Sequence, residues 1–130
     1  MSQETPKWMK ITGIVLTVLP AFALIMSGFM KLSHNPGFVE NFKKFGFAEP
    51  LLTPIGIIEL LSIALYLVPR TAVLGAILVT GYLGGAIVTH LRVQDFGSIP
   101  APLFLAVFAW GGLFLRDARL RDLLPLRKPA

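Results

Sequence analysis

The sequence contains no cysteine, few histidines and few charged residues, and each shortage excludes a class of protein. Without cysteine the chain has no dithiol–disulfide exchange, no iron–sulfur cluster and no thiolate metal site of its own. Its two histidines, His34 and His90, are too few for a multi-histidine metal site within one chain. Charged residues make up 15% of the 130 residues, whereas 55% are hydrophobic and the mean hydropathy is +0.72. This composition is typical of a membrane protein.

Four long apolar runs account for most of the chain and cover residues 11–30, 51–68, 71–91 and 96–115. Each is close to the ~20 residues needed to span ~30 Å of hydrocarbon in a helix. We therefore predict an all-α fold, an integral membrane four-helix bundle, with residues 1–130 forming a single domain. The segments outside the lipid are too short for a soluble catalytic domain, so any chemistry takes place in the bundle or at its rim.

The one sizeable loop, residues 33–50, carries the signals of a short helix between spans one and two. Asn35 is a suitable N-cap, Pro36 fits the first helical position, and Gly46 can terminate the helix. Three phenylalanines recur between them at helical spacing: Phe38, Phe42 and Phe45. We predict an amphipathic helix that either anchors the loop in the interface or covers the end of the bundle as a lid.

The third run is rich in glycine, and Gly81 and Gly85 have the GxxxG spacing that allows helices to approach closely in lipid. Packing of this face within the bundle is the default interpretation, and a homodimer through Gly81 and Gly85 is the alternative. After the fourth run, residues 116–130 alternate arginine with leucine and predict an interfacial helix.

Lysine and arginine are distributed unequally between the two sides of the predicted bundle. The side with both termini carries eight of the twelve: Lys7, Lys10, Arg70, Arg116, Arg119, Arg121, Arg127 and Lys128. The side with the loop helix carries four: Lys31, Lys43, Lys44 and Arg92. The positive-inside rule then places both termini in the cytoplasm. Because these charges lie at span ends, the +5 net charge indicates the lipid bilayer as partner and not nucleic acid.

Polar residues within the spans mark the candidate site. Glu59 lies in the middle of the second run, where an ionisable group costs a few kcal/mol and usually has a partner. The topology brings five polar residues to compatible depths in the outer half of the bundle: Ser27, Lys31, Glu59, Tyr82 and His90. We predict that they line a ligand pocket without a metal. Two structural alternatives stay open: Glu59 and Lys31 form a buried ion pair that fixes register, or Lys31 and Arg92 extend to the lipid headgroups.

Four strings of residues in the spans carry a family resemblance: Ser27-Gly28-x-x-Lys31-Leu32, Gly56-x-x-Glu59-Leu60-Leu61, Pro69-Arg70-Thr71-Ala72-x-Leu74-Gly75-Ala76 and Gly81-Tyr82-Leu83-Gly84-Gly85-Ala86-Ile87-x-Thr89-His90-x-Arg92. With them the chain resembles the DoxX-like family of small bacterial membrane proteins, from about Ile11 to Arg127. The resemblance implies four transmembrane helices in the bacterial cytoplasmic (inner) membrane. It also implies a tie to redox systems, because one relative is the membrane subunit of a thiosulfate:quinone oxidoreductase.

Three functional hypotheses follow. In the first, the chain is an accessory subunit of a membrane redox system that binds a quinone or lipid headgroup in the pocket. Glu59 and His90 would exchange protons there, and a partner protein would supply electrons. In the second, it is a non-catalytic assembly or chaperone module for another membrane protein. A proton-coupled carrier using Glu59 is a third option that would need a dimer. Quinone is the candidate cofactor and a lipid headgroup the alternative ligand, no covalent cofactor is expected, and whether the chain is an enzyme stays open.

The predicted orientation can be tested with single cysteines, because the natural chain has none. Cysteines at Ser2, Ser33, Ser98 and Ala130 are exposed to an impermeant thiol reagent on intact spheroplasts. We expect labelling at positions 33 and 98 only, since the positive-inside rule places those loops outside. Labelling at position 2 or 130 would show that the termini lie outside and would contradict the predicted orientation.

Overall fold

The computed structural model describes residues 5–129, and within them the regular structure is entirely helical. The helices are α1 (Lys7–Leu32), α2 (Pro36–Phe45), α3 (Leu52–Leu67), α4 (Ala72–Arg92), α5 (Pro100–Arg116) and α6 (Ala118–Arg121). Short 3-10 turns precede three of them: η1 (Glu49–Leu51), η2 (Pro69–Thr71) and η3 (Phe96–Ser98). Positions 2 and 130, chosen for labelling, lie outside the described residues.

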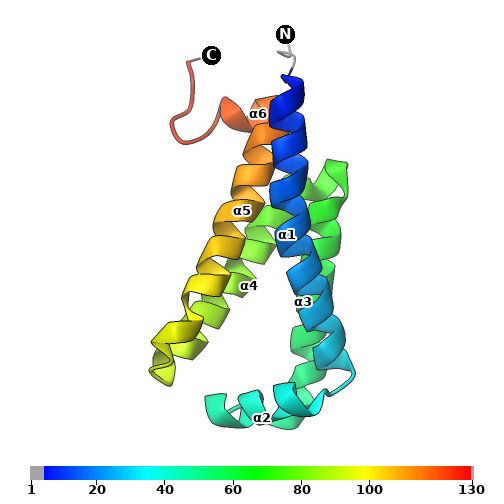
Figure 1. The fold of residues 1–130 in the computed structure, drawn as a ribbon, viewed down its shortest axis with the longest axis vertical. Helices are drawn as coiled ribbons and strands as arrows, with labels where there is room; N and C mark the ends of the chain where they lie inside the picture. The colour runs from blue at the N-terminus through cyan, green and yellow to red at the C-terminus, as the bar shows by residue number, and fades with distance from the viewer. Residues whose placement is uncertain (1–4, 130) are drawn as a thin grey trace.

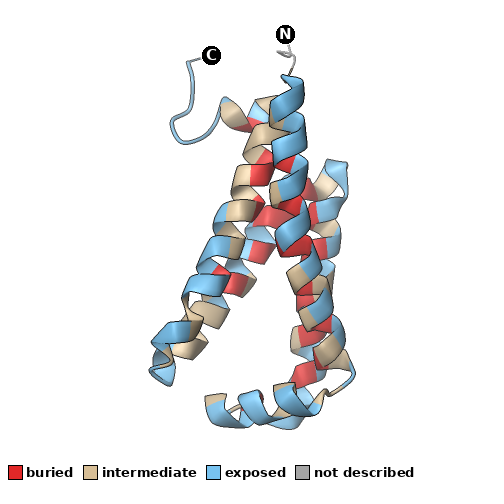
Figure 2. Ribbon diagram, in the orientation of Figure 1, coloured by how far each residue is buried: buried red, intermediate tan, exposed pale blue. Residues whose placement is uncertain are grey.

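Four helical segments are long and apolar enough to cross a membrane, which confirms the predicted fold class. They cover Lys7–Leu32, Glu49–Leu67, Pro69–Arg92 and Phe96–Arg116, with mean hydropathies between 1.8 and 2.1. The largest difference from the predicted spans is at the first, which begins four residues earlier, at Lys7 rather than residue 11. Most large apolar side chains on their outer faces are exposed, as expected for surfaces that contact lipid (Figure 2).

The four long helices form a ring in which α1 packs against α3 and α5, and α4 packs against the same two helices. They lie close together at the end where α1 begins and α5 ends (Figure 1). Toward the other end the pair α4 and α5 diverges from the pair α1 and α3, and α2 lies across the widened end. We call these the narrow end and the wide end of the bundle.

Glycines permit the close contacts at the narrow end. A Cβ atom at Gly112 of α5 would lie 2.8 Å from the carbonyl oxygen of Gly13 on α1. A Cβ atom at Gly75 of α4 would overlap the backbone of Tyr66 on α3. These helices therefore approach almost backbone to backbone, which is a common way to gain packing energy where lipid supplies no hydrophobic drive.

The prediction that the glycines of the third span pack within the bundle is wrong for most of them. Gly75 is in a close contact. A Cβ atom added at Gly81, Gly84 or Gly85, in contrast, would lie more than 4 Å from the neighbouring helices of the described chain. The reason is the divergence of the helices: α4 stays beside α5 but moves away from α1 and α3 toward the wide end, and Gly81 and Gly85 line the cavity there. The GxxxG pair therefore does not make a helix contact within the described part of the chain.

The loop helix is confirmed as α2, with the predicted bounds and caps. The side chain of Asn35 accepts a hydrogen bond from the backbone N–H of Gly37 at 2.9 Å. Gly46 terminates the helix with a φ of 82°, a left-handed conformation that glycine adopts without steric cost. Phe42 is buried and its neighbours at 38 and 45 are half-buried, so the aromatic face points into the bundle.

The predicted interfacial helix of the tail is reduced to α6, which ends at Arg121. Its Leu120 is buried, and the guanidinium of Arg121 donates to the carbonyls of Phe114 and Leu115 at 2.8 and 2.9 Å. Arg121 thus satisfies carbonyls that the end of α5 leaves free. The helix does not continue toward Pro125, which has no N–H to donate and disfavours helical geometry in the preceding residue.

A pair of alanine substitutions tests the close contact between α3 and α4. Gly75→Ala should destabilise the bundle by about 1–3 kcal/mol, because the new methyl group must displace the backbone of Tyr66. Gly84→Ala on the same helix is the matched control, since its methyl group enters open space. The measurement is the midpoint of thermal unfolding in detergent, and equal midpoints for the two variants would contradict the packing.

Candidate functional site

A buried ion pair between Lys31 and Glu59 joins α1 and α3 within the wide end of the bundle. The ammonium Nζ of Lys31 lies 3.2 Å from each carboxylate oxygen of Glu59 and donates to Ser27 Oγ at 2.6 Å. Ser27 Oγ in turn donates to Glu59 Oε2 at 3.1 Å. Glu59 is 1% exposed and Lys31 is 7% exposed. The three donors of the ammonium are therefore used within the cluster, and its two charges compensate each other.

This geometry decides between the two structural alternatives for Lys31. Extension of Lys31 to the lipid headgroups is wrong, because its side chain is turned inward and paired. The ion pair with Glu59 is present. Small residues beside the pair allow α1 and α3 to approach closely, since a Cβ atom at Gly56 would lie 3.0 Å from Lys31 Cβ and 3.2 Å from the carbonyl oxygen of Gly28.

Aromatic rings surround the ammonium on its remaining sides. Lys31 Nζ lies 5.1 Å from the ring centre of Phe38 on α2 and 5.7 Å from that of Tyr82 on α4. A cation over an aromatic face is attracted by the negative face of the ring. The phenol of Tyr82 also lies beside the Glu59 carboxylate and Ser27. Tyr82 therefore brings α4 into contact with the Lys31–Glu59–Ser27 cluster, whose other members lie on α1 and α3.

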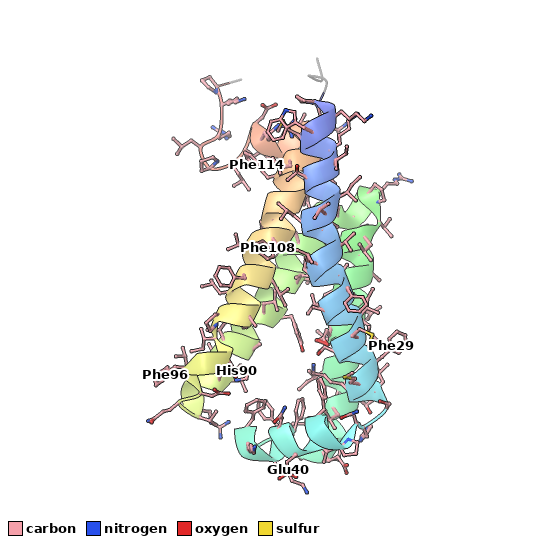
Figure 3. The ribbon with its side chains drawn as sticks, in the orientation of Figure 1. Phe29, Glu40, His90, Phe96, Phe108 and Phe114 are labelled. Atoms are coloured by element: carbon pink, nitrogen blue, oxygen red, sulfur yellow. The ribbon has the colours of Figure 1, made fainter. Side chains whose placement is uncertain are left out.

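All five residues predicted for the pocket line one cavity of about 480 Å³ in the wide end. Its other walls are mostly apolar, with three phenylalanines of α2, residues of α5 and the glycines at 81 and 85 of α4. Figure 3 shows His90 near the diverging end of α4, whereas Glu40 of α2 points away from the space between the helices. Volume and lining both fit a small-molecule site, which is typically apolar with a few polar groups.

The cavity ends toward the narrow end at a packed core. Ile63, Val79 and Ala109 are almost fully buried there, on α3, α4 and α5. Ser62, one turn from Glu59 on α3, is buried and donates its hydroxyl to the carbonyl of Ile58 at 2.7 Å. Tyr66, one turn further, donates its hydroxyl to the carbonyl of Ala109 and lies 3.4 Å from Thr17 Oγ1. The side-chain hydrogen bonds of Ser62 and Tyr66 are therefore made to backbone carbonyls and to Thr17, and not to the Lys31–Glu59 cluster.

One residue at the mouth of the cavity, Asp95, has no counterpart in the sequence prediction. Its Oδ2 lies 3.3 Å from Nδ1 of His90, whose ring also meets the ring of Phe45 edge-on at 5.0 Å between centres. Hydrogen bonding from Ser98, and after that from His90, lowers the pKa of Asp95 below its usual value. The carboxylate therefore stays ionised at neutral pH. Its position follows from the turn after α4, in which Gln94 has a φ of 59°.

Sequence spacing could not have revealed this pair. Residues at i and i+5 do not share a helix face, and Asp95 lies beyond the last residue of α4. The only signal was a carboxylate just after a helix that ends in His90 and Arg92. Among residues 5–129, no group of three or more His, Asp or Glu side chains comes together.

A model of the DoxX-like family matches residues 15–112, which is most of the chain and includes every residue of the cavity. No curated protein and no solved structure matches the chain.

A double-mutant cycle measures the coupling within the buried pair. Glu59→Gln and Lys31→Met should each destabilise by about 3–5 kcal/mol, because each leaves an uncompensated buried group. The double variant should recover 0.5–3 kcal/mol or more of the summed loss, roughly the range for residues in contact. The readout is unfolding in detergent by circular dichroism, and strictly additive losses would show that the two side chains act independently.

Proposed function

This chain belongs to the DoxX-like family, and we propose that it is an accessory subunit of a membrane redox system that binds the headgroup of a quinone or a similar neutral lipid in its cavity. The observation that carries the proposal is the convergence of Ser27, Lys31, Glu59, Tyr82 and His90 on one apolar cavity. A bundle that needed polar groups for register alone would be served by the Lys31–Glu59 pair.

The charge balance of the cavity supports an uncharged ligand. Lys31 and Glu59 compensate each other and are hydrogen-bonded within their cluster. A charged headgroup entering the cavity would therefore meet no free counter-ion, and its desolvation would be costly. Tyr82 and His90 have hydrogen-bonding capacity beyond the cluster and lie on one face of α4, eight residues apart, or roughly 12 Å along the axis. A ring with polar atoms at opposite edges suits two such groups.

The aromatic walls support a flat headgroup with an apolar tail. Phenylalanines from α2 provide ring faces on which a quinone ring can stack in the offset or edge-to-face manner that aromatic pairs prefer. The outer face of α5 beside the cavity exposes Leu103, Phe104 and Val107 to lipid. A prenyl tail that leaves the cavity would contact the same lipid environment. The electrons would come from a partner protein, because the sequence has no cysteine to hold a cluster.

The proposed setting is the bacterial cytoplasmic membrane, with both termini in the cytoplasm and α2 on the outer side. The distribution of lysine and arginine supports this orientation. The headgroup would then bind in the outer half of the bundle, and the narrow end would lie toward the cytoplasm.

An assembly module for another membrane protein is the second candidate, and the open glycines favour it. Gly81, Gly84 and Gly85 leave space beside α4 in which the backbone of another helix, including that of a second copy in a homodimer, can pack. Gly81 and Gly85 also line the cavity. A helix seated there would therefore cover the cavity wall, so the two functions compete for the same surface.

Ligand-dependent stability tests the proposal. A quinone with a decyl tail at ~100-fold its Kd should stabilise the wild type by about 2.7 kcal/mol, because it binds only the native state. Tyr82→Phe and His90→Gln should reduce that shift while the ligand-free protein stays folded. His34→Gln is the matched control, since His34 does not line the cavity. Thermal unfolding in detergent is the readout, and an unchanged midpoint with quinones and neutral lipids would favour the assembly module.

A further inference from the structure

The pair of His90 and Asp95 fixes which nitrogen of the imidazole carries the proton. An ionised carboxylate only accepts hydrogen bonds, so the contact between Asp95 Oδ2 and His90 Nδ1 requires a hydrogen on Nδ1. In the neutral ring the second nitrogen, Nε2, is then left as an acceptor. No described residue donates a hydrogen bond to Nε2, and the ring lines the cavity.

Asp95 is held in this position independently of the cavity. The backbone N–H of Asp95 donates to the carbonyl of His90 at 2.9 Å and the N–H of Gln94 donates to that of Leu91 at 3.0 Å, which closes the end of α4. Ser98 donates its N–H to the carbonyl of Asp95 from the following turn. The carboxylate is therefore presented to Nδ1 by the backbone of the turn.

The other charged groups around the ring do not replace Asp95. Arg92 extends toward Gly46, and Lys43 and Lys44 are exposed in the last turn of α2. The Lys31–Glu59 pair is closed within its own cluster. None of these groups hydrogen-bonds His90 within the described residues, so Asp95 alone selects the tautomer.

We infer that Asp95 is a positioning residue that makes His90 a hydrogen-bond acceptor, so that the cavity prefers a hydroxyl-bearing headgroup, such as a hydroquinone or phenol, over the corresponding quinone. A hydroquinone O–H can donate to Nε2, whereas a quinone carbonyl meets a lone pair there. The inference rests on the proposed function, because it names the chemical form of the ligand that the same cavity favours. It concerns binding only and involves no transfer of electrons.

The tautomer is measured first, without ligand. With ¹⁵N-labelled histidine the chain gives only two imidazoles, His34 and His90, which His34→Gln assigns. At the alkaline end of a pH titration, where both rings are neutral, we expect His90 to carry its proton on Nδ1. Asp95→Asn should move that proton toward Nε2, as in enzymes where an asparagine replaces the carboxylate partner of a histidine. A wild-type His90 with its proton on Nε2 overturns the inference, even if the variant does not fold.

A matched control uses the second histidine. His34 Nδ1 lies 3.9 Å from Glu49 Oε1, outside the cavity, and His34 Nε2 is hydrogen-bonded to Thr53. Glu49→Gln should leave the nitrogen signals of His90 unchanged. A change at His90 in Glu49→Gln that equals the change in Asp95→Asn would point to a general effect of lost charge and overturn the specific role of Asp95.

Ligand preference is measured second, with an alkyl-hydroquinone and the matching alkyl-benzoquinone under anaerobic conditions. We expect the wild type to bind the hydroquinone about fivefold more tightly, the effect of one net hydrogen bond, and Asp95→Asn to lose that preference. Equal affinity of the wild type for both overturns this inference and leaves the proposed function standing. Binding of neither overturns both.

Discussion

The buried contact between Lys31 and Glu59 constrains the wide end of the bundle more than any other interaction. Removing two ions from water costs several kcal/mol for each ion, and their attraction compensates for this only in good geometry. Good geometry requires that α1 and α3 lie close together, which Gly28 and Gly56 permit. It also requires further hydrogen bonds, which Ser27 supplies. Once satisfied, the cluster is neutral, and the space beside it can stay apolar.

The cavity is a consequence of how side-chain size is distributed along the helices. At the narrow end glycine lies opposite glycine or opposite backbone, so α1 meets α5 and α3 meets α4 at close range. At the wide end Tyr82, the Lys31 cluster and the aromatic face of α2 occupy the corresponding positions. The pair α4 and α5 therefore diverges from the pair α1 and α3 toward that end, whereas Gly28 and Gly56 keep α1 and α3 in contact there. The short helix α2 then covers an opening that the four spans do not close by themselves.

Local signals in the sequence were sufficient for the spans and for α2, because hydropathy, caps and helical spacing depend on neighbouring residues. They also placed the polar residues of the cavity in the same half of the bundle, since depth follows from helical rise. Three features depend on how the helices cross and were not accessible in this way. Gly81 and Gly85 have a packing motif but lie where α4 diverges. Asp95 reaches His90 through a turn, and the tail loses its helix beyond Arg121.

The two ends of the cavity differ, because a packed core closes it toward the narrow end. Ile63, Val79 and Ala109 fill the space toward the end that holds the termini. Between Glu59 and Tyr66 on α3, the buried hydroxyl of Ser62 donates to the carbonyl of Ile58 in its own helix. At the wide end, His90 lines the cavity and contacts the half-exposed Asp95, which lies at the surface of the protein. For a headgroup bound in the proposed site, His90 and Asp95 are therefore the titratable groups that would relay a proton to the side of the membrane on which α2 lies.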